Sequence, residues 1–169
     1  DNRLGVEAME LLDAYGIPTP DGEIVAAPDA ATEVAARIDG AVAMKIVSPD
    51  ILHKSDIGGV EVGVADGDVA DTYADLVGRA RRYQPDATIL GVHVQEMVDL
   101  DDGVETIVGV NRDPQFGPLI LFGLGGIFVE IVEDTTCRVA PVSAPEAAAM
   151  TREIDAAPLL RGARGRDPV

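Results

Sequence analysis

The most informative segment of the chain is Met44-Lys-Ile-Val-Ser-Pro-Asp-Ile-Leu-His-Lys-Ser-Asp-Ile-Gly-Gly-Val60. It opens within an apolar run, residues 41–47, whose composition is typical of a buried strand. Residues 48–58 contain many turn-forming residues, and residues 59–64 alternate between apolar and polar positions as a strand does. The stretch therefore predicts two strands joined by a polar loop.

Lys45 lies in the middle of the apolar run, where an unpaired ammonium group would cost several kcal/mol. Its charge therefore needs a partner. One interpretation is structural: the side chain reaches solvent at a strand edge or pairs with a buried carboxylate. The other interpretation is functional, and in it the ammonium group binds a phosphate.

The loop brings together His53, Lys54, Asp56, Gly58 and Gly59. A neutral imidazole can act as a nucleophile or proton acceptor near neutral pH, and a nearby carboxylate such as Asp56 can fix its tautomer. Adjacent glycines let backbone N–H groups approach a phosphate closely. A loop histidine is usually only a solvated side chain, but this combination predicts His53 as a catalytic residue. We expect the loop itself to have no role in the core.

Lys45 and Lys54 are the two lysines of a chain of 169 residues, which has 30 acidic and 13 basic residues and a formal charge of −17. A surface rich in carboxylates and poor in lysine keeps a protein soluble in concentrated salt, which predicts a halophilic source. A protein that avoids lysine on its surface should keep it where it is hard to replace. Both lysines lie within residues 45–56, which again indicates this segment as functional. The negative charge argues against binding to nucleic acid or to an anionic membrane surface.

The sequence lacks the patterns of secreted, membrane-spanning, P-loop and Cys/His metal-binding proteins. The single cysteine, Cys137, cannot form an internal disulfide, and there is no pattern of a signal peptide and no apolar stretch near the roughly 20 residues of a membrane span. We therefore expect a cytoplasmic location. The glycines at 123, 125 and 126 fit neither the dinucleotide-binding fingerprint nor the P-loop, and no Cys/His metal pattern is present.

Periodicity predicts the remaining elements. Helices are expected over about 3–15, after Pro28-Asp29 up to Gly40, over 68–83 and over 144–154, and strands over 23–27, 88–98, 104–110 and 118–124. Residues 127–132 are expected to be strand or short helix. This order of elements argues for an α+β fold with a mixed or antiparallel sheet.

The turn Asp99–Gly103 suggests that strands 88–98 and 104–110 form an antiparallel hairpin, which would bring Glu96 and Glu105 near one end of it. Two such carboxylates could hold a ribose or a metal, although solvated carboxylates are common in so acidic a chain. His93 lies within the first of these strands with no adjacent cation, and we interpret it as structural.

Five pieces of the sequence are distinctive: Leu12–Pro18, Met44–Val60, Val94–Met97, Glu105–Pro118 and Phe122–Ile127. The most specific of them contains His-Lys-Ser-Asp-Ile-Gly-Gly-Val at residues 53–60. Together these pieces resemble the ATP-grasp domain of NDP-forming acyl-CoA synthetases, and the resemblance covers nearly the whole chain.

The resemblance implies an ATP-grasp fold, in which two α+β lobes with antiparallel sheets clamp a nucleotide, with residues 1–169 forming a single nucleotide-binding domain. It implies an acid–thiol ligase (ADP-forming), such as an ADP-forming acetyl-CoA synthetase, which interconverts acyl-CoA, ADP and phosphate with the acid, CoA and ATP through phosphohistidine. ATP or ADP and Mg²⁺ are the expected cofactors.

The resemblance also implies roles for individual residues. His53 would carry phosphate to the nucleotide, Lys45 and Lys54 would bind phosphates, and Gly58 and Gly59 would cover them. The remaining implied residues line the nucleotide pocket: Glu96, Met97 and Val98 around adenine and ribose, and Glu105 near ribose or phosphate.

One departure concerns the C-terminus. Relatives continue into a segment with an Asp and an Asn that is expected to bind Mg²⁺, whereas this chain stops at Val169. We therefore expect a truncated domain whose metal ligands are missing. A CoA-binding alpha subunit or domain is the expected partner, within an oligomer.

Two other interpretations stay open. The same domain occurs fused to acetyltransferase domains, where nucleotide binding would serve regulation. The beta chain of succinyl-CoA synthetase is a cousin, but it has Gly-Arg-Gly-Lys where this chain has Leu52-His-Lys-Ser55. The acyl substrate and the preference for ADP or GDP are left open by the sequence.

Overall fold

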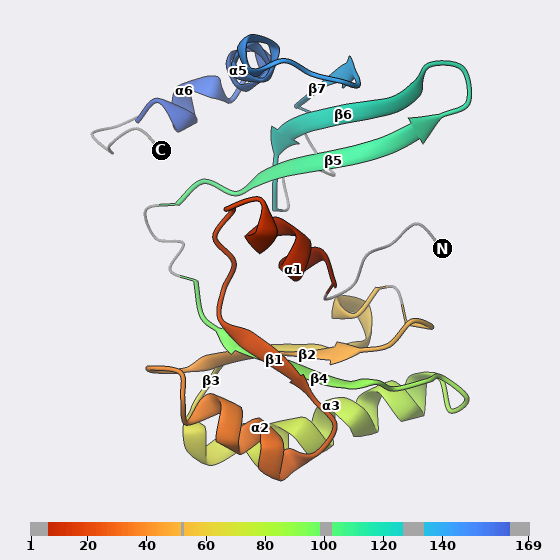
Figure 1. The fold of residues 1–169 in the computed structure, drawn as a ribbon. Helices are drawn as coiled ribbons and strands as arrows, with labels where there is room; N and C mark the ends of the chain where they lie inside the picture. Colours follow the sequence, from red (N-terminus) through yellow and green to blue (C-terminus); the bar gives the residue numbers. More distant parts are fainter. Residues whose placement is uncertain (1–6, 52, 99–102, 127–133, 163–169) are drawn as a thin grey trace. The chain divides into compact units, whose positions relative to one another are not determined.

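The computed structural model describes residues 7–51, 53–98, 103–126 and 134–162 (Figure 1). The chain divides into two compact units, residues 1–98 and 99–169. Each unit contains its own antiparallel sheet. No helix in the described ranges has both the length and the apolar composition needed to cross a membrane.

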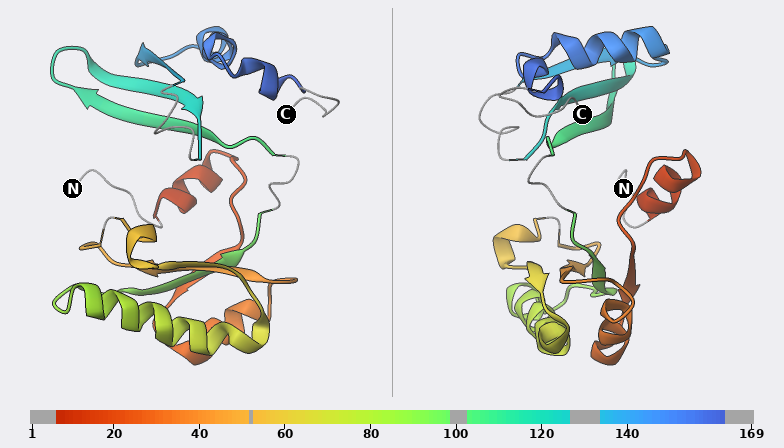
Figure 2. Two further views of the ribbon diagram at one scale, coloured as in Figure 1. Left: turned by 180° about the vertical axis from the view of Figure 1, so that it is seen from behind. Right: turned by 90° about the vertical axis from the view of Figure 1, so that its left-hand side faces the viewer.

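The first unit is built on a four-stranded sheet with strand order β1-β4-β2-β3. All neighbouring strands are antiparallel. Two helices cover one face of the sheet in both views (Figures 1 and 2). The elements are α1 (Glu7–Ala14), β1 (Gly22–Val25), α2 (Pro28–Ala35), β2 (Val42–Val47), β3 (Val60–Val64), α3 (Val69–Tyr83) and β4 (Gly91–Glu96).

The core of this unit lies between the sheet and the helices α2 and α3. Alternate residues of β2 and β4 point to it, as the two-residue period of a strand requires. From α3, apolar side chains at helical spacing pack against the sheet. The buried cluster includes Val42, Met44, Ile46, Val92, Val94, Val69, Tyr73, Leu76 and Ala80.

The predicted strand with Lys45, the following strand and the helix over 68–83 are confirmed with small shifts at their ends. Helix α2 ends at Ala35 instead of continuing to Gly40. There the N–H groups of Arg37 and Ile38 donate to carbonyls three residues earlier, at 3.0 Å each, which tightens the chain into turns.

The predicted hairpin of strands 88–98 and 104–110 is wrong. β4 is an inner strand, hydrogen-bonded to β1 on one edge and to β2 on the other. Both edges are therefore satisfied, and the next strand pairs within the other unit. A polar turn indicates that the chain leaves the strand, but it does not indicate which strands pair.

The second unit has a three-stranded sheet with order β5-β6-β7. Its strands are β5 (Thr106–Asp113), β6 (Gly117–Leu124) and β7 (Thr135–Val139), and its helices are α5 (Ala144–Glu153) and α6 (Ala157–Leu160). The strand over 118–124 and the helix over 144–154 are confirmed, whereas β7 and α6 have no counterpart in the prediction. The element predicted at 127–132 lies outside the described residues.

Candidate functional site

Lys45 lies on the face of the four-stranded sheet that α2 and α3 leave uncovered. Its cross-strand partner on β4 is His93, and Gln95 follows two residues later on the same face. The Nζ atom of Lys45 donates a hydrogen bond to Oε1 of Gln95 at 2.9 Å. His93 and Gln95 are each only 8% exposed. The three side chains therefore form a partly buried polar group on this face.

The electrostatics of this group favour an added negative charge. Burial and the nearby charge of Lys54 lower the pKa of Lys45. Burial, followed by the charges of Lys45 and Lys54, lowers the pKa of His93. Because the hydrogen-bond partner of Lys45 is a neutral amide, its positive charge is not compensated by that contact. The hollow at His93 is also lined by the acidic residues Glu10 and Asp13 of α1, so both signs of charge occur on this face.

Two predictions about these residues need correction. The buried carboxylate considered as a structural partner for Lys45 is not found among the described residues, where its hydrogen bond goes to Gln95. His93 does have an adjacent cation, because strand pairing places Lys45 directly opposite it. The order of residues along the chain could not reveal this neighbour, which is 48 positions away in sequence (93 − 45).

The predicted loop closes with a single 3₁₀ turn, Ser55–Ile57, which lies on the side of the sheet opposite α2 and α3 in both figures (Figures 1 and 2). The N–H of Gly58 donates to the carbonyl of Ser55 at 3.0 Å, and that of Gly59 donates to Lys54 at 2.7 Å. Ile46, next to Lys45, donates its N–H to the carbonyl of Gly59 at 2.9 Å. The loop therefore returns to the sheet beside Lys45.

Both glycines of the loop have structural reasons to be glycine. Gly58 has φ +63°, in the left-handed region, and ends the 3₁₀ turn. A Cβ at Gly59 would lie 2.8 Å from Cγ2 of Ile46 and 2.8 Å from the carbonyl oxygen of Lys54. These requirements hold whether or not the glycines also cover a phosphate.

The loop is more firmly anchored than expected. Ile51 is 3% exposed and belongs to the core, so the expectation that the loop has no core role is wrong. Oδ2 of Asp50 accepts a hydrogen bond from the N–H of Thr88 at 2.7 Å. His53 itself is exposed, and no hydrogen bond joins it to Asp56. An exposed imidazole on an anchored loop is accessible to a phosphoryl donor.

The end of β4 places Glu96 away from Lys45. Its N–H donates to the carbonyl of Asp21 at 2.8 Å, and alternation puts its side chain on the opposite face from Gln95. There it lines a hollow of about 330 Å³ together with residues of β1 and α2 and with Arg37 and Ile38, which follow α2. Met97 and Val98 follow with exposed side chains. The structure therefore groups Lys45 with Gln95 and His93, and not with the Glu96 carboxylate.

Glu105 belongs to the second unit, immediately before β5. Its carbonyl accepts a hydrogen bond from the N–H of Gly125 at 2.8 Å. Gly126, with φ +63°, lies so close that a Cβ there would meet the carboxylate of Glu105. The glycine-rich bend thus packs directly on Glu105. This packing is a sufficient reason for glycine at positions 125 and 126, and no bound nucleotide is needed to explain it.

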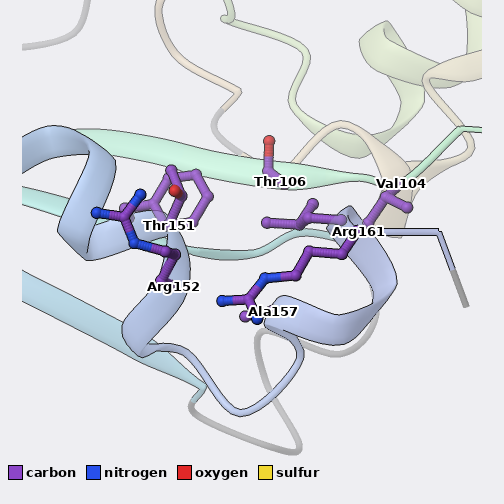
Figure 3. Close-up of a pocket in the computed structure, with 8 residues that line it drawn as sticks. Val104, Thr106, Thr151, Arg152, Ala157 and Arg161 are labelled. Atoms are coloured by element: carbon purple, nitrogen blue, oxygen red, sulfur yellow. The ribbon is translucent and has the colours of Figure 1, made fainter. Parts of the chain in front are cut away.

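The second unit also contains a hollow of about 560 Å³ (Figure 3). Two arginines, Arg152 and Arg161, lie at it. Its other lining residues are Val104, Thr106, Phe122, Thr151, Ala157 and Leu160. None of the residues that the sequence predicts as functional lines this hollow. Its size alone therefore does not make it the site.

Within the described ranges, no group of three or more His, Cys, Asp or Glu side chains could hold a metal ion. The residue that sequence reasoning missed is Gln95, the hydrogen-bond partner of Lys45. Its position two residues after His93 shows that the two share a face, but only the pairing of β2 with β4 brings them to Lys45.

Comparison with known proteins identifies the family of the chain. A family model described as an ATP-grasp domain matches residues 2–169. The chain is 48% identical over 164 residues to the acetate–CoA ligase (ADP-forming) I subunit beta of Pyrococcus furiosus, covering 96% of the chain and 70% of that subunit. It is 44% identical over 165 residues to acetate–CoA ligase (ADP-forming) I of Archaeoglobus fulgidus, covering 98% of the chain and 24% of that protein.

Two solved structures of dinucleotide forming acetyl-coenzyme A synthetase 1 from Candidatus Korarchaeum cryptofilum are similar. The complex with coenzyme A, Ca-AMPCP and HgCl⁺ has a TM-score of 0.89 and 42% identity, covering 96% of this chain and 71% of that chain. In the complex with coenzyme A and Mg-AMPPCP, the phosphohistidine segment points towards the nucleotide binding site. That complex has a TM-score of 0.79 and 39% identity, covering 98% of this chain and 70% of that one.

These similarities confirm the predicted α+β fold with antiparallel sheets. The chain belongs to the ATP-grasp domain family, and within it to the relatives that form beta subunits or domains of ADP-forming acyl-CoA ligases.

Proposed function

We propose that the chain is the nucleotide-binding, phosphoryl-transfer part of an ADP-forming acyl-CoA synthetase, an acid–thiol ligase acting on acetyl-CoA or a related acyl-CoA. The observation that carries the proposal is the ammonium group of Lys45, which is partly buried and hydrogen-bonded to a neutral amide on the face of the sheet opposite α2 and α3. Relatives named as ADP-forming acetate–CoA ligases support it.

In this proposal His53 carries the phosphoryl group. A ring nitrogen of the neutral imidazole forms a bond to phosphorus while the bond from phosphorus to its donor breaks. A terminal oxygen of ADP then attacks the same phosphorus, the N–P bond breaks, and ATP and a neutral imidazole result. Lys45 and Lys54 stabilise the charge on the transferred group, because phosphoryl transfer depends mainly on positioning and on cations near its oxygens.

The remaining binding residues are proposed from the resemblance. Gly58 and Gly59 cover the phosphates, and Glu105 lies near ribose or phosphate. Met97 and Val98, both exposed just after β4, line the adenine pocket together with Glu96. The Korarchaeum relative binds Mg-AMPPCP. We propose Mg²⁺ as a cofactor here too, but the described residues offer no cluster to hold it, so no step is assigned to it.

The proposal includes a larger assembly. Residues 1–169 act as one nucleotide-binding domain, and a CoA-binding alpha subunit or domain of the same synthetase supplies the acyl chemistry within an oligomer. The acidic, lysine-poor composition supports a halophilic source. A cytoplasmic location fits the CoA-dependent reaction.

Phosphate mapping tests the proposal. The chain is incubated with ATP labelled on the γ-phosphate and with Mg²⁺, and acid-labile label is mapped by proteolysis. We expect label on His53 in the parent, none in His53→Asn, and retention in His93→Gln. ATP binding should persist in His53→Asn, because the imidazole is exposed and has no hydrogen bond to Asp56. Label on His93, or no label in the parent, would refute the assignment.

A further inference from the structure

Arg79, on α3, contacts the loop of His53 from the helix side. Its Nη1 donates to the carbonyl oxygen of Gly58 at 2.9 Å and to Oε1 of Glu61 at 2.5 Å. Its Nη2 donates to Oδ2 of Asp75 at 3.2 Å. The hydrogen bond to Glu61 is the main reason that the pKa of Arg79 is raised. A permanently charged guanidinium therefore links α3, β3 and the loop.

The contact with Gly58 is made where the loop is closed. Gly58 ends the 3₁₀ turn, and the neighbouring N–H of Gly59 reaches back to the carbonyl of Lys54. Arg79 is therefore connected to Lys54 by its hydrogen bond to Gly58, the peptide bond from Gly58 to Gly59 and the hydrogen bond from Gly59 to Lys54, and His53 directly precedes Lys54. On the other side of His53, Asp50 and Ile51 are anchored to Thr88 and to the core.

We propose that Arg79 is a positioning residue for phosphoryl transfer: by holding the carbonyl of Gly58, it fixes Lys54 and His53 relative to Lys45. This inference rests on the proposed function. His53 and Lys54 lie between two anchored points of the loop. One is at Asp50 and Ile51, and the other is at Gly58, which the side chain of Arg79 on α3 holds. Misplacing reacting groups by about 1 Å can cost two orders of magnitude in rate, so the anchor affects the chemical step.

The residue type supports this role. A guanidinium presents donors in fixed directions in one plane, which lets a single side chain bind a carbonyl and two carboxylates together. The ammonium group of a lysine is a point charge on a flexible stem and would not reproduce all three contacts. Arg79 is also 31% exposed, so its ion pairs alone contribute little to stability.

The experiment measures labelling of His53 from γ-labelled ATP against ATP concentration, together with the Kd for ATP. In Arg79→Met, the rate at saturating ATP should fall about tenfold or more, a larger factor than any change in Kd or in the half-saturating ATP concentration. Arg79→Lys should recover part of the rate. The control is Glu61→Gln, which removes the carboxylate partner but leaves the bond from Arg79 to Gly58, and should label at nearly the parent rate.

The outcomes separate the two proposals. If the parent is labelled and Arg79→Met is labelled at the same rate, the role of Arg79 is overturned while the proposed function stands. Equal losses of labelling rate in Arg79→Met and Glu61→Gln would have the same meaning. If Arg79→Met does not fold, Arg79→Lys decides, and a full parent rate there overturns the role. An unlabelled parent would remove the proposed function and this inference with it.

Discussion

Lys45 carries the charge on which nucleotide binding should depend most. Lys45→Ala should raise the Kd for ATP about tenfold or more, because a charge-assisted hydrogen bond contributes roughly 1.5–3 kcal/mol. The matched control is Arg82→Ala, which removes a positive charge from an exposed position in the last turn of α3. Calorimetric titration measures both variants, and equal dissociation constants would show that Lys45 does not bind the phosphates.

His93 should make the fold sensitive to mild acid. Its pKa is lowered from the ordinary value of 6.5, first by burial and then by Lys45 and Lys54. The folded state therefore binds fewer protons than the unfolded state, so stability falls as pH drops below 6.5 through the lowered pKa. In urea unfolding from about pH 8 to about pH 5, His93→Gln should lose less stability than the parent. Parallel losses would contradict this.

At the level of elements, the sequence predicts what is local. β2, α3 and α5 carry their own periodicity, and the residues of the His53 loop are contiguous, so both could be recognised from the sequence. Strand pairing could not, because alternation shows which residues share a face but not which strand lies alongside. Gln95 and Arg79 reach the site from β4 and α3, and only tertiary structure reveals them.

The start of α5 should be a source of acid sensitivity in the second unit. The carboxylate of Glu146 accepts hydrogen bonds from the hydroxyl of Ser143 at 2.5 Å and from its N–H at 2.9 Å. These bonds, the hydroxyl first, lower the pKa of Glu146 below its ordinary 4.5. Their stabilisation is present above that value and is lost as pH falls through the lowered pKa.

Glu146→Gln should therefore be less stable than the parent at neutral pH, and the difference should shrink as the solution is acidified below 4.5. Chemical unfolding at a series of pH values measures it. Ser143→Ala removes the partner, so the double variant should lose less than the sum of the two single losses. Additive losses, or a difference that does not change with pH, would contradict a shared contact.

The net charge of the whole molecule has a consequence for stability. Thirty acidic residues against thirteen basic ones leave a formal charge of −17 on 169 residues. Few of these carboxylates are compensated: the described residues contain only four ion pairs, and two of them share Arg79. Like charges spread over a compact surface repel one another and destabilise the folded state.

Potassium chloride should therefore stabilise the protein. The Debye length falls from about 10 Å at 0.1 M salt to about 3 Å at 1 M, so molar KCl screens repulsion between neighbouring surface carboxylates. We expect the melting temperature, measured by calorimetry at neutral pH, to rise by several degrees as KCl is raised to molar concentration. The rise should be smaller near pH 4, because carboxylates are then partly protonated and repel less. A melting temperature that falls steadily with KCl at neutral pH would mean that surface repulsion is not the dominant electrostatic effect, and the halophilic interpretation of the composition would be lost.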